Sequence, residues 1–133
     1  MIFIDADAFI ALNFTKDVHY KKACILMEKL EEKEDILVTS WQVIDEVATK
    51  LSYFGIKQQA TNFLKWITNS DIKIVYVNEK MTSKIIKQFK EQTSKRVSLT
   101  DCTNMVIAEE MGVKQIFSFD KHYKQNGFEL LGK

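Results

Sequence analysis

Strand-like and helix-like segments alternate along almost the whole chain, and this alternation limits the available folds more than any other feature. Short apolar runs rich in branched and aromatic residues predict strands at residues 1–5, 36–38, 72–77 and 115–119, and an edge strand at 128–131. Apolar residues at helical spacing predict helices at about residues 18–34, 41–54, 57–69, 79–92 and 98–111. Such alternation is typical of a three-layer α/β/α sandwich with a central, mostly parallel sheet.

Composition places the chain among ordinary globular proteins. It has 133 residues, of which 46% are hydrophobic, so we expect one domain over residues 1–133. The formal net charge of +1 does not indicate a strongly basic nucleic-acid binder. Cys24 and Cys102 lack metal-ligand spacing, and reduced thiols fit the cytoplasm. No apolar run approaches the length of a membrane span, and acids follow the first strand at once, so we expect neither a membrane segment nor a signal peptide.

Four acidic residues stand at predicted structural junctions. Asp5 and Asp120 each follow a predicted strand, Asp101 opens a helix, and Glu46 lies within the helix at 41–54. In parallel sheets, ligands bind beyond the carboxyl ends of strands, at the point where the strand order reverses. If the fold gathers these four acids, they form an oxygen-ligand cluster suited to Mg²⁺ or Mn²⁺.

Two helix starts carry the spacing of a capping box. Thr39 with Gln42 predicts the start of one helix, and Ser98 with Asp101 predicts the start of another. A capping role is therefore an alternative to a functional role for Asp101. The two roles are compatible, because a carboxylate has several lone pairs.

Other catalytic motifs are absent from the chain. It has no phosphate-binding GxxxxGK[ST] or GxGxxG loop, no GxSxG elbow and no HExxH zinc motif. The two histidines, His19 and His122, are too few and too far apart in sequence to predict a histidine-based zinc site. Carboxylates around a divalent cation are suited to phosphodiester hydrolysis, because the metal activates water and stabilises the leaving oxyanion.

The order of these acids resembles that of PIN-domain ribonucleases, and among them the VapC-type toxins of toxin–antitoxin pairs. The first acid follows the opening strand, the second lies in a "TS…E" helix, the third ends an "S-x-x-D" helix start, and the fourth lies in a "T-x-D-x-x-F" segment. The matching segments are Phe3–Asp7, Thr39–Val47, Ser98–Asp101 and Phe117–Tyr123. Ser118 takes the hydroxyl position of the last motif and Tyr123 the aromatic position, while Asp7 stands where the family often has Asn, Ser or Thr.

The resemblance implies a metal-dependent endoribonuclease with a PIN-like, Rossmann-like fold. Asp5, Glu46 and Asp101 would hold Mg²⁺ or Mn²⁺, and Asp120 would be a further ligand or would orient one. Asp7 and Ser118 would support these ligands. The toxin subfamily implies an RNA substrate, a homodimer and a small antitoxin.

A further expectation concerns the RNA backbone. Lys95 and Arg96 precede the helix that begins at Asp101, and they are candidates for phosphate contacts.

Two other functions remain open on the sequence alone. Asp5-Ala6-Asp7-Ala8 resembles the D-x-D-x signature of haloacid-dehalogenase phosphatases, in which the first aspartate is a nucleophile. A catalytically silent interaction module of the PIN-like fold is the other alternative. A phospho-acceptor receiver is disfavoured, because the strand at 72–77 ends in Asn78 and not in an acceptor aspartate.

Overall fold

A five-stranded, fully parallel sheet forms the centre of the protein, as a computed structural model describes it for residues 1–132. The strands are β1 (Ile2–Ile4), β2 (Leu37–Ser40), β3 (Lys73–Val75), β4 (Gln115–Phe117) and β5 (Glu129–Leu130). Their order across the sheet is β3-β2-β1-β4-β5, and each neighbouring pair is parallel. The predicted parallel sheet is therefore confirmed.

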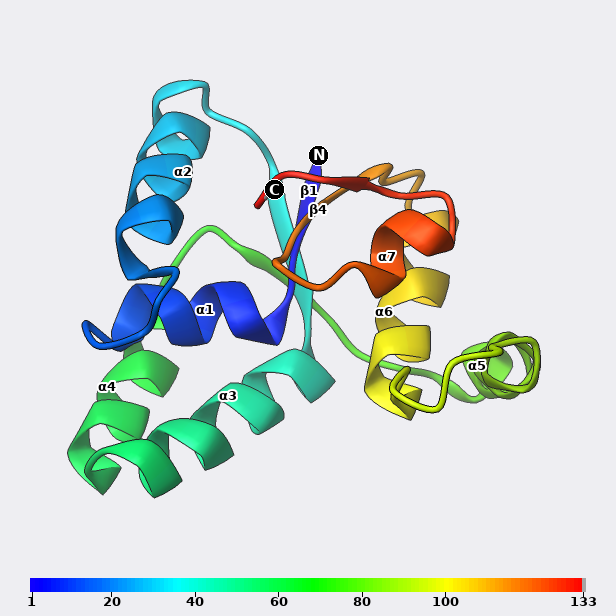
Figure 1. Cartoon of the computed structure of the whole chain (residues 1–133), viewed down its shortest axis with the longest axis horizontal. Helices are drawn as coiled ribbons and strands as arrows, with labels where there is room; N and C mark the ends of the chain where they lie inside the picture. The colour runs from blue at the N-terminus through cyan, green and yellow to red at the C-terminus, as the bar shows by residue number, and fades with distance from the viewer. Residues whose placement is uncertain (133) are drawn as a thin grey trace.

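Helices cover both faces of this sheet. They are α1 (Ala6–Asn13), α2 (Tyr20–Glu32), α3 (Trp41–Phe54), α4 (Lys57–Thr68), α5 (Glu79–Lys90), α6 (Leu99–Glu110) and α7 (His122–Gln125). In Figure 1, α1, α2 and α4 lie on one side of the strands and α5, α6 and α7 on the other, with α3 along the lower edge. The three-layer α/β/α architecture follows from this arrangement. Within residues 1–132, no helix combines the length and hydrophobicity that a membrane crossing requires.

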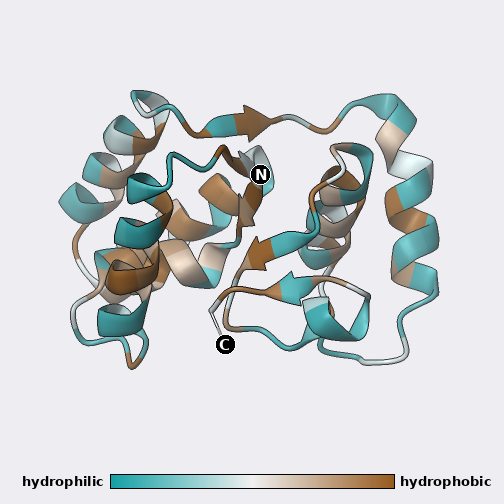
Figure 2. Cartoon of the chain, turned by 90° about the horizontal axis from the view of Figure 1, so that it is seen from above, coloured by the Kyte–Doolittle hydropathy of each residue, from teal (hydrophilic) through white to brown (hydrophobic). Residues whose placement is uncertain are grey.

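The strands and the inner faces of the helices supply the hydrophobic core. The three residues of β1 are all buried, because this strand lies between two others and has helices on both faces. Figure 2 shows mostly hydrophobic strands, whereas hydrophilic and hydrophobic residues alternate along the outer helices. Such amphipathic helices bury one face against the sheet, which is the arrangement that the helical spacing predicts.

Helix α1 was not predicted from the sequence. It begins directly after β1, with Asp5 as its N-cap, and five of its eight residues are buried. A short helix buried on most sides has no polar face, so its residues lack the periodicity by which an amphipathic helix is recognised. Asp7 therefore lies in the first turn of a helix, which favours a carboxylate because the backbone N–H groups there are unpaired.

The capping prediction for α3 was wrong by one residue. Ser40 is the N-cap, and its Oγ accepts a hydrogen bond from the Val43 backbone N–H at 3.1 Å. The Thr39 hydroxyl instead donates to the Ile4 carbonyl at 2.8 Å, across to β1. Neighbouring side chains of a strand point to opposite faces, so only one of the two hydroxyls can face the helix start. The capping box of Ser98 and Asp101 in α6 is confirmed.

The order of the strands reverses at β1, which is flanked by β2 on one side and β4 on the other. The carboxyl ends of β1 and β4 are held side by side, and the Asp5 backbone N–H donates to the Phe117 carbonyl at 3.1 Å. Asp5 and Ser118 follow these two ends directly. The chain therefore places its first predicted acid at the kind of crevice where parallel sheets bind ligands.

Candidate active site

Asp5 is the most deeply placed acid of the site, with 6% of its surface exposed. Its Oδ1 accepts hydrogen bonds from the Ala6 backbone N–H at 2.7 Å and from Asn104 Nδ2 at 3.2 Å. Its Oδ2 lies 3.1 Å from Ser118 Oγ. Both oxygens are thus oriented by donors, although no lysine or arginine forms an ion pair with Asp5 within residues 1–132.

Ser118 connects Asp5 to Asp7. Its Oγ lies 3.1 Å from Asp5 Oδ2 and 3.1 Å from Asp7 Oδ1, and it accepts a hydrogen bond from the Asp120 backbone N–H at 3.0 Å. The Phe119 backbone N–H donates to Asp7 Oδ2 at 3.0 Å. A hydroxyl has a single proton, so Ser118 can donate to only one of the two carboxylates at a time.

Burial and mutual repulsion disfavour the charged forms of these acids. Burial raises the pKa of Asp5 well above its usual range, and the charges of Asp7 and Asp101 raise it further. Burial likewise raises the pKa of Asp7 to about 6, although the Phe119 backbone N–H and Ser118 oppose the shift and Asp120 adds to it. Like charges at close range in a low dielectric have this effect, and a bound cation would reverse it.

Asp101 faces the same crevice from the first turn of α6. Its Oδ2 accepts a hydrogen bond from the Ser98 backbone N–H at 3.0 Å, which completes the capping box. Its Oδ1 lies 3.5 Å from the hydroxyl of Tyr123. The cap occupies one oxygen and leaves the other directed toward the acid cluster, so capping does not preclude a ligand role.

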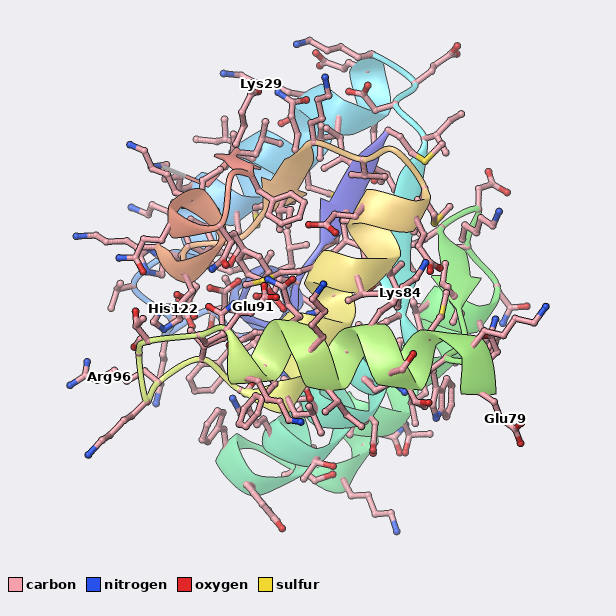
Figure 3. All side chains as sticks on the ribbon, turned by 90° about the vertical axis from the view of Figure 1, so that its right-hand side faces the viewer. Lys29, Glu79, Lys84, Glu91, Arg96 and His122 are labelled. Atoms are coloured by element: carbon pink, nitrogen blue, oxygen red, sulfur yellow. The ribbon has the colours of Figure 1, made fainter. Side chains whose placement is uncertain are left out.

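Asp120 lies at the rim, in the segment between β4 and α7. Its Oδ1 accepts a hydrogen bond from the His122 backbone N–H at 2.9 Å, and His122 Nε2 lies 3.5 Å from the same oxygen. The hydrogen bond from its backbone N–H to Ser118 Oγ at 3.0 Å places Asp120 next to the cluster. In Figure 3, His122 lies at the end of the molecule to which the C-terminus of α5 points.

Glu46 is the predicted acid that the structure joins least closely to the others. Its carboxylate pairs with Lys50 at 3.5 Å, one turn further along α3. No hydrogen bond or ion pair connects it to Asp5, Asp101 or Asp120 within residues 1–132. It lines a surface hollow of about 430 Å³ together with Thr100, the sequence neighbour of Asp101. Glu46 thus lies beside the cluster, held by its own helix.

The two basic candidates lie in the loop between α5 and α6. Lys95 and Arg96 are both exposed, and the Arg96 backbone N–H donates to Ser94 Oγ at 3.2 Å. Figure 3 shows Arg96 projecting into solvent at the same end of the molecule as His122. Neither side chain forms an ion pair within the described part of the chain, so both charges are available to a polyanion.

The carboxylate oxygens of the site have the chemistry that a hard divalent cation requires. They lie further apart than the ligands of a bound metal ion do. Asp5, Asp7, Asp101 and Asp120 supply carboxylate oxygens only, which Mg²⁺ and Mn²⁺ prefer. Among residues 1–132, no three His, Cys, Asp or Glu side chains stand close enough together to hold a metal ion as they are. A cation would therefore have to draw the carboxylates inward, which their mutual repulsion opposes until positive charge is present.

Sequence reasoning missed one residue at the centre of the site. Asn104 is fully buried, donates from Nδ2 to Asp5 and accepts from the Ser40 hydroxyl at 3.0 Å. Its position within an apolar helical run offers a signal that could have found it, because a buried amide requires partners on every side. The hydroxyl of Tyr123 was also overlooked, since the motif indicated only an aromatic ring at this position.

Comparison with known proteins identifies the fold. No protein-family model and no curated protein matches the chain by sequence. Among solved structures, it is similar to VapC20 of Mycobacterium tuberculosis, a PIN-domain toxin that cleaves the sarcin–ricin loop. The TM-score is 0.85 over 96% of each chain, at 18% sequence identity. The chain therefore has the PIN-domain fold, which confirms the fold that the sequence resemblance implies.

Proposed function

We propose that this protein is a metal-dependent endoribonuclease that hydrolyses RNA phosphodiester bonds. The observation that carries the proposal is the partly buried acid cluster at the carboxyl edge of β1 and β4, in which Asp5 is the buried member. The charges of Asp7 and Asp101 repel that of Asp5 there, and none of the three forms an ion pair with a basic side chain within residues 1–132. Such a cluster is costly for a folded protein unless a cation neutralises it. The fold of VapC20, an RNA-cleaving toxin, supports the same activity.

Each residue has a role that follows from its place. Asp5 and Asp101 would be the central ligands of Mg²⁺ or Mn²⁺, with Asp120 and Glu46 as further ligands, and Glu46 would have to leave its Lys50 partner to take part. A divalent cation supplies an activated water for attack and neutralises the charge on the phosphodiester. Asp7 and Ser118 hold Asp5 and Asp120 in position through the hydrogen bonds at Ser118 Oγ. Lys95 and Arg96 contact the RNA backbone.

The biological setting belongs to the same proposal. Similarity to a toxin supports a toxin of a toxin–antitoxin pair, acting in the cytoplasm as a homodimer that a small antitoxin inhibits. An exposed apolar patch beside the site is available for such contacts. It consists of Tyr53, Phe54 and Ile56, which are 81%, 57% and 68% exposed. Patches of this kind mark protein interaction sites.

The test is RNA cleavage by purified, partner-free protein. Mixed tRNA and rRNA are incubated with Mg²⁺, with Mn²⁺ or with a chelator, using wild type, Asp5→Asn and the matched control Asp45→Asn, an exposed acid on α3. We expect discrete cuts that require metal, disappear with Asp5→Asn and persist with Asp45→Asn. Full metal-dependent cleavage by Asp5→Asn would contradict the mechanism.

Metal binding without turnover separates the remaining alternatives. A ligand that binds only the folded state raises the melting temperature, so Mn²⁺ should stabilise wild type and Asp45→Asn but not Asp5→Asn. An unchanged melting temperature would favour the silent interaction module. A phosphate label transferred to Asp5 from a phosphomonoester would favour the phosphatase alternative, because that mechanism requires a covalent phosphoenzyme.

A further inference from the structure

Two buried polar side chains lie between the carboxylates of Asp5 and Asp101, and the metal chemistry described above does not use them. Asn104 and Tyr123 are both 0% exposed. Asn104 Nδ2 lies 3.2 Å from Asp5 Oδ1 and 3.1 Å from the Tyr123 hydroxyl oxygen. The same hydroxyl lies 3.5 Å from Asp101 Oδ1. A continuous hydrogen-bonded chain thus runs from one acid to the other.

The number of N–H and O–H groups on Asn104 and Tyr123 determines which atom donates in each of these hydrogen bonds. The Asn104 amide has two N–H groups, one for Asp5 and one for Tyr123, and its Oδ1 accepts from the Ser40 hydroxyl at 3.0 Å. An amide nitrogen can only donate, so the Tyr123 oxygen is the acceptor in that contact. The one hydroxyl proton of Tyr123 is therefore free to point toward the carboxylates of Asp5 and Asp101.

The hydroxyl of Tyr123 is buried and lies within hydrogen-bonding distance of Asp101 Oδ1. Burial raises the pKa of Tyr123 well above its usual range, and the charges of Asp5 and Asp101 raise it further. The residue is thus a neutral donor placed between two negative groups. The other carboxylate oxygen of Asp101, Oδ2, accepts a hydrogen bond from the Ser98 backbone N–H.

The bridge also joins elements that are far apart in sequence. Asn104 lies on α6, and it connects Asp5 after β1, Ser40 at the start of α3 and Tyr123 in α7. Tyr123 takes the aromatic position of the segment that resembles the last PIN-type motif. Its ring packs against Phe128, with centroids 6.5 Å apart, and does not depend on the hydroxyl for its position.

We propose that Asn104 and Tyr123 form a bridge that sets the separation and orientation of Asp5 and Asp101, so that the two carboxylates can receive a divalent cation. This inference rests on the proposed function. Both residues are positioning residues, because they act on the metal through the two acids. Hydrogen-bond partners of metal ligands typically change metal affinity by about 10- to 100-fold.

The decisive variant is Tyr123→Phe, which removes the hydroxyl and keeps the ring. We expect the Mn²⁺ affinity, measured from free Mn²⁺ by electron paramagnetic resonance, to fall by about 10-fold. The metal-free melting temperature should change little, and cleavage at saturating Mn²⁺ should lose kcat with KM for RNA unchanged. Tyr76→Phe is the matched control, because Tyr76 is exposed and stacks on Trp41 through its ring.

A second variant tests whether the two residues act as one unit. Asn104→Ser keeps a donor and an acceptor in a shorter side chain, and alone it should also weaken Mn²⁺ binding. The double variant Asn104→Ser/Tyr123→Phe should bind Mn²⁺ about as weakly as either single variant, because either substitution alone already breaks the bridge. If the two substitutions reduced the Mn²⁺ affinity additively, Asn104 and Tyr123 would act independently, which would contradict the proposed bridge.

The outcome for wild type separates this inference from its premise. If wild type binds no Mn²⁺, the metal centre itself is wrong and the bridge has nothing to position. If wild type binds Mn²⁺ and cleaves RNA while Tyr123→Phe does both equally well, the metal centre stands and the bridge is refuted. A Tyr123→Phe protein that melts far below wild type without metal would assign the hydroxyl a structural role instead.

Discussion

At the scale of single residues, the main feature of the site is that Ser118 has one hydroxyl proton and lies between two carboxylates. It can therefore donate a hydrogen bond to only one of them at a time. Asp5 and Asp7 both approach Ser118 Oγ at 3.1 Å. When both acids are ionised, one of them faces a lone pair of the hydroxyl. Uptake of a proton by Asp7, or arrival of a cation, removes that conflict. Protonation and metal binding are thus alternative ways of relieving the same repulsion.

The stability of the metal-free protein should therefore depend on pH through Asp7. Its pKa is about 6 in the folded protein against an ordinary value of 3.8, so between these values the folded state binds a proton that the unfolded chain does not. The free energy of unfolding should rise as the pH falls from 7.5 to 5, by about 1–2 kcal/mol from this group alone. The raised pKa of Asp5 acts in the same direction.

Urea unfolding at several pH values in the presence of a chelator measures this effect. Asp7→Asn should flatten the rise, because an amide does not titrate, while Asp45→Asn should leave it unchanged. Saturating Mn²⁺ should also flatten it in wild type. An identical pH dependence for wild type and Asp7→Asn would show that the carboxyl of Asp7 has an ordinary pKa.

The site residues that could be predicted from the sequence are those that lie at the end of a predicted strand or at the start of a predicted helix. Asp5 and Asp120 follow apolar strands and Asp101 opens a helix, so their convergence could be predicted from topology alone. The apolar helical run around Asn104 could have marked it as a buried amide, but its partners could not be predicted, because they lie 99, 64 and 19 residues away and no local pattern encodes them. The pairing of Glu46 with Lys50, in place of a contact with Asp5, Asp101 or Asp120, is a side-chain detail that sequence spacing does not determine.

At the level of elements, the starts of α1, α3 and α6 deliver side chains to the crevice. Asp5 caps α1, Ser40 caps α3 and Ser98 caps α6. Helix starts concentrate unpaired N–H groups, which orient acidic and hydroxyl side chains. Residues of the site are thus also helix N-caps. A substitution that removes a cap should therefore change both the stability of the helix and the geometry of the site.

Ser40→Ala should cost more stability than an ordinary cap. It removes the bond to the Val43 N–H and leaves Asn104 Oδ1 buried without a donor. We expect a loss of about 2–4 kcal/mol in the free energy of unfolding. Asn78→Ala is the matched control, because Asn78 caps α5 by accepting from the Met81 N–H and is exposed, so the free energy of unfolding should fall by about 1 kcal/mol. Equal decreases in urea unfolding would argue against the coupling.

The elements differ in how far the sequence predicts them. The long amphipathic helices follow from periodicity, since each has one face in the core, whereas the central strands follow from short apolar runs, since both of their faces are buried. The identity of the cap of α3 required the direction of two neighbouring side chains in β2, which depends on the placement of β1. Helix α1 is short and largely buried, so packing specifies it where periodicity cannot.

At the scale of the whole molecule, the charges are nearly balanced, with a net charge of +1. As the proposed nuclease, with an acidic site and little net charge, the protein would gain its attraction for RNA from a bound metal and from a few exposed cations. Lys95 and Arg96 lie in the loop that precedes α6, whose start carries Asp101. They are therefore placed to contribute locally where the whole molecule contributes little.

Replacing Lys95 and Arg96 together by Ala should weaken RNA binding and reduce its dependence on salt. For every phosphate that the protein no longer neutralises, the slope of log K against log salt should become shallower by about 0.7–0.9. Binding is measured with Asp5→Asn protein to prevent cleavage, and Lys29→Ala/Lys33→Ala on the far side is the control (Figure 3 shows Lys29 away from Arg96). An unchanged slope would exclude the loop from the RNA interface.

The sheet order brings the first strand of the chain beside one of the last. Ser118 contacts Asp5 across 113 residues of sequence, and Tyr123 lies later still. Contacts between such distant segments form late, after the loops between them have closed. During synthesis, the ribosome releases Asp5 long before Ser118 and Tyr123, at about 5–20 residues per second. A nascent chain therefore carries Asp5 and Asp7 without the rest of the site, and the cluster is assembled only once the segment through Tyr123 has been made.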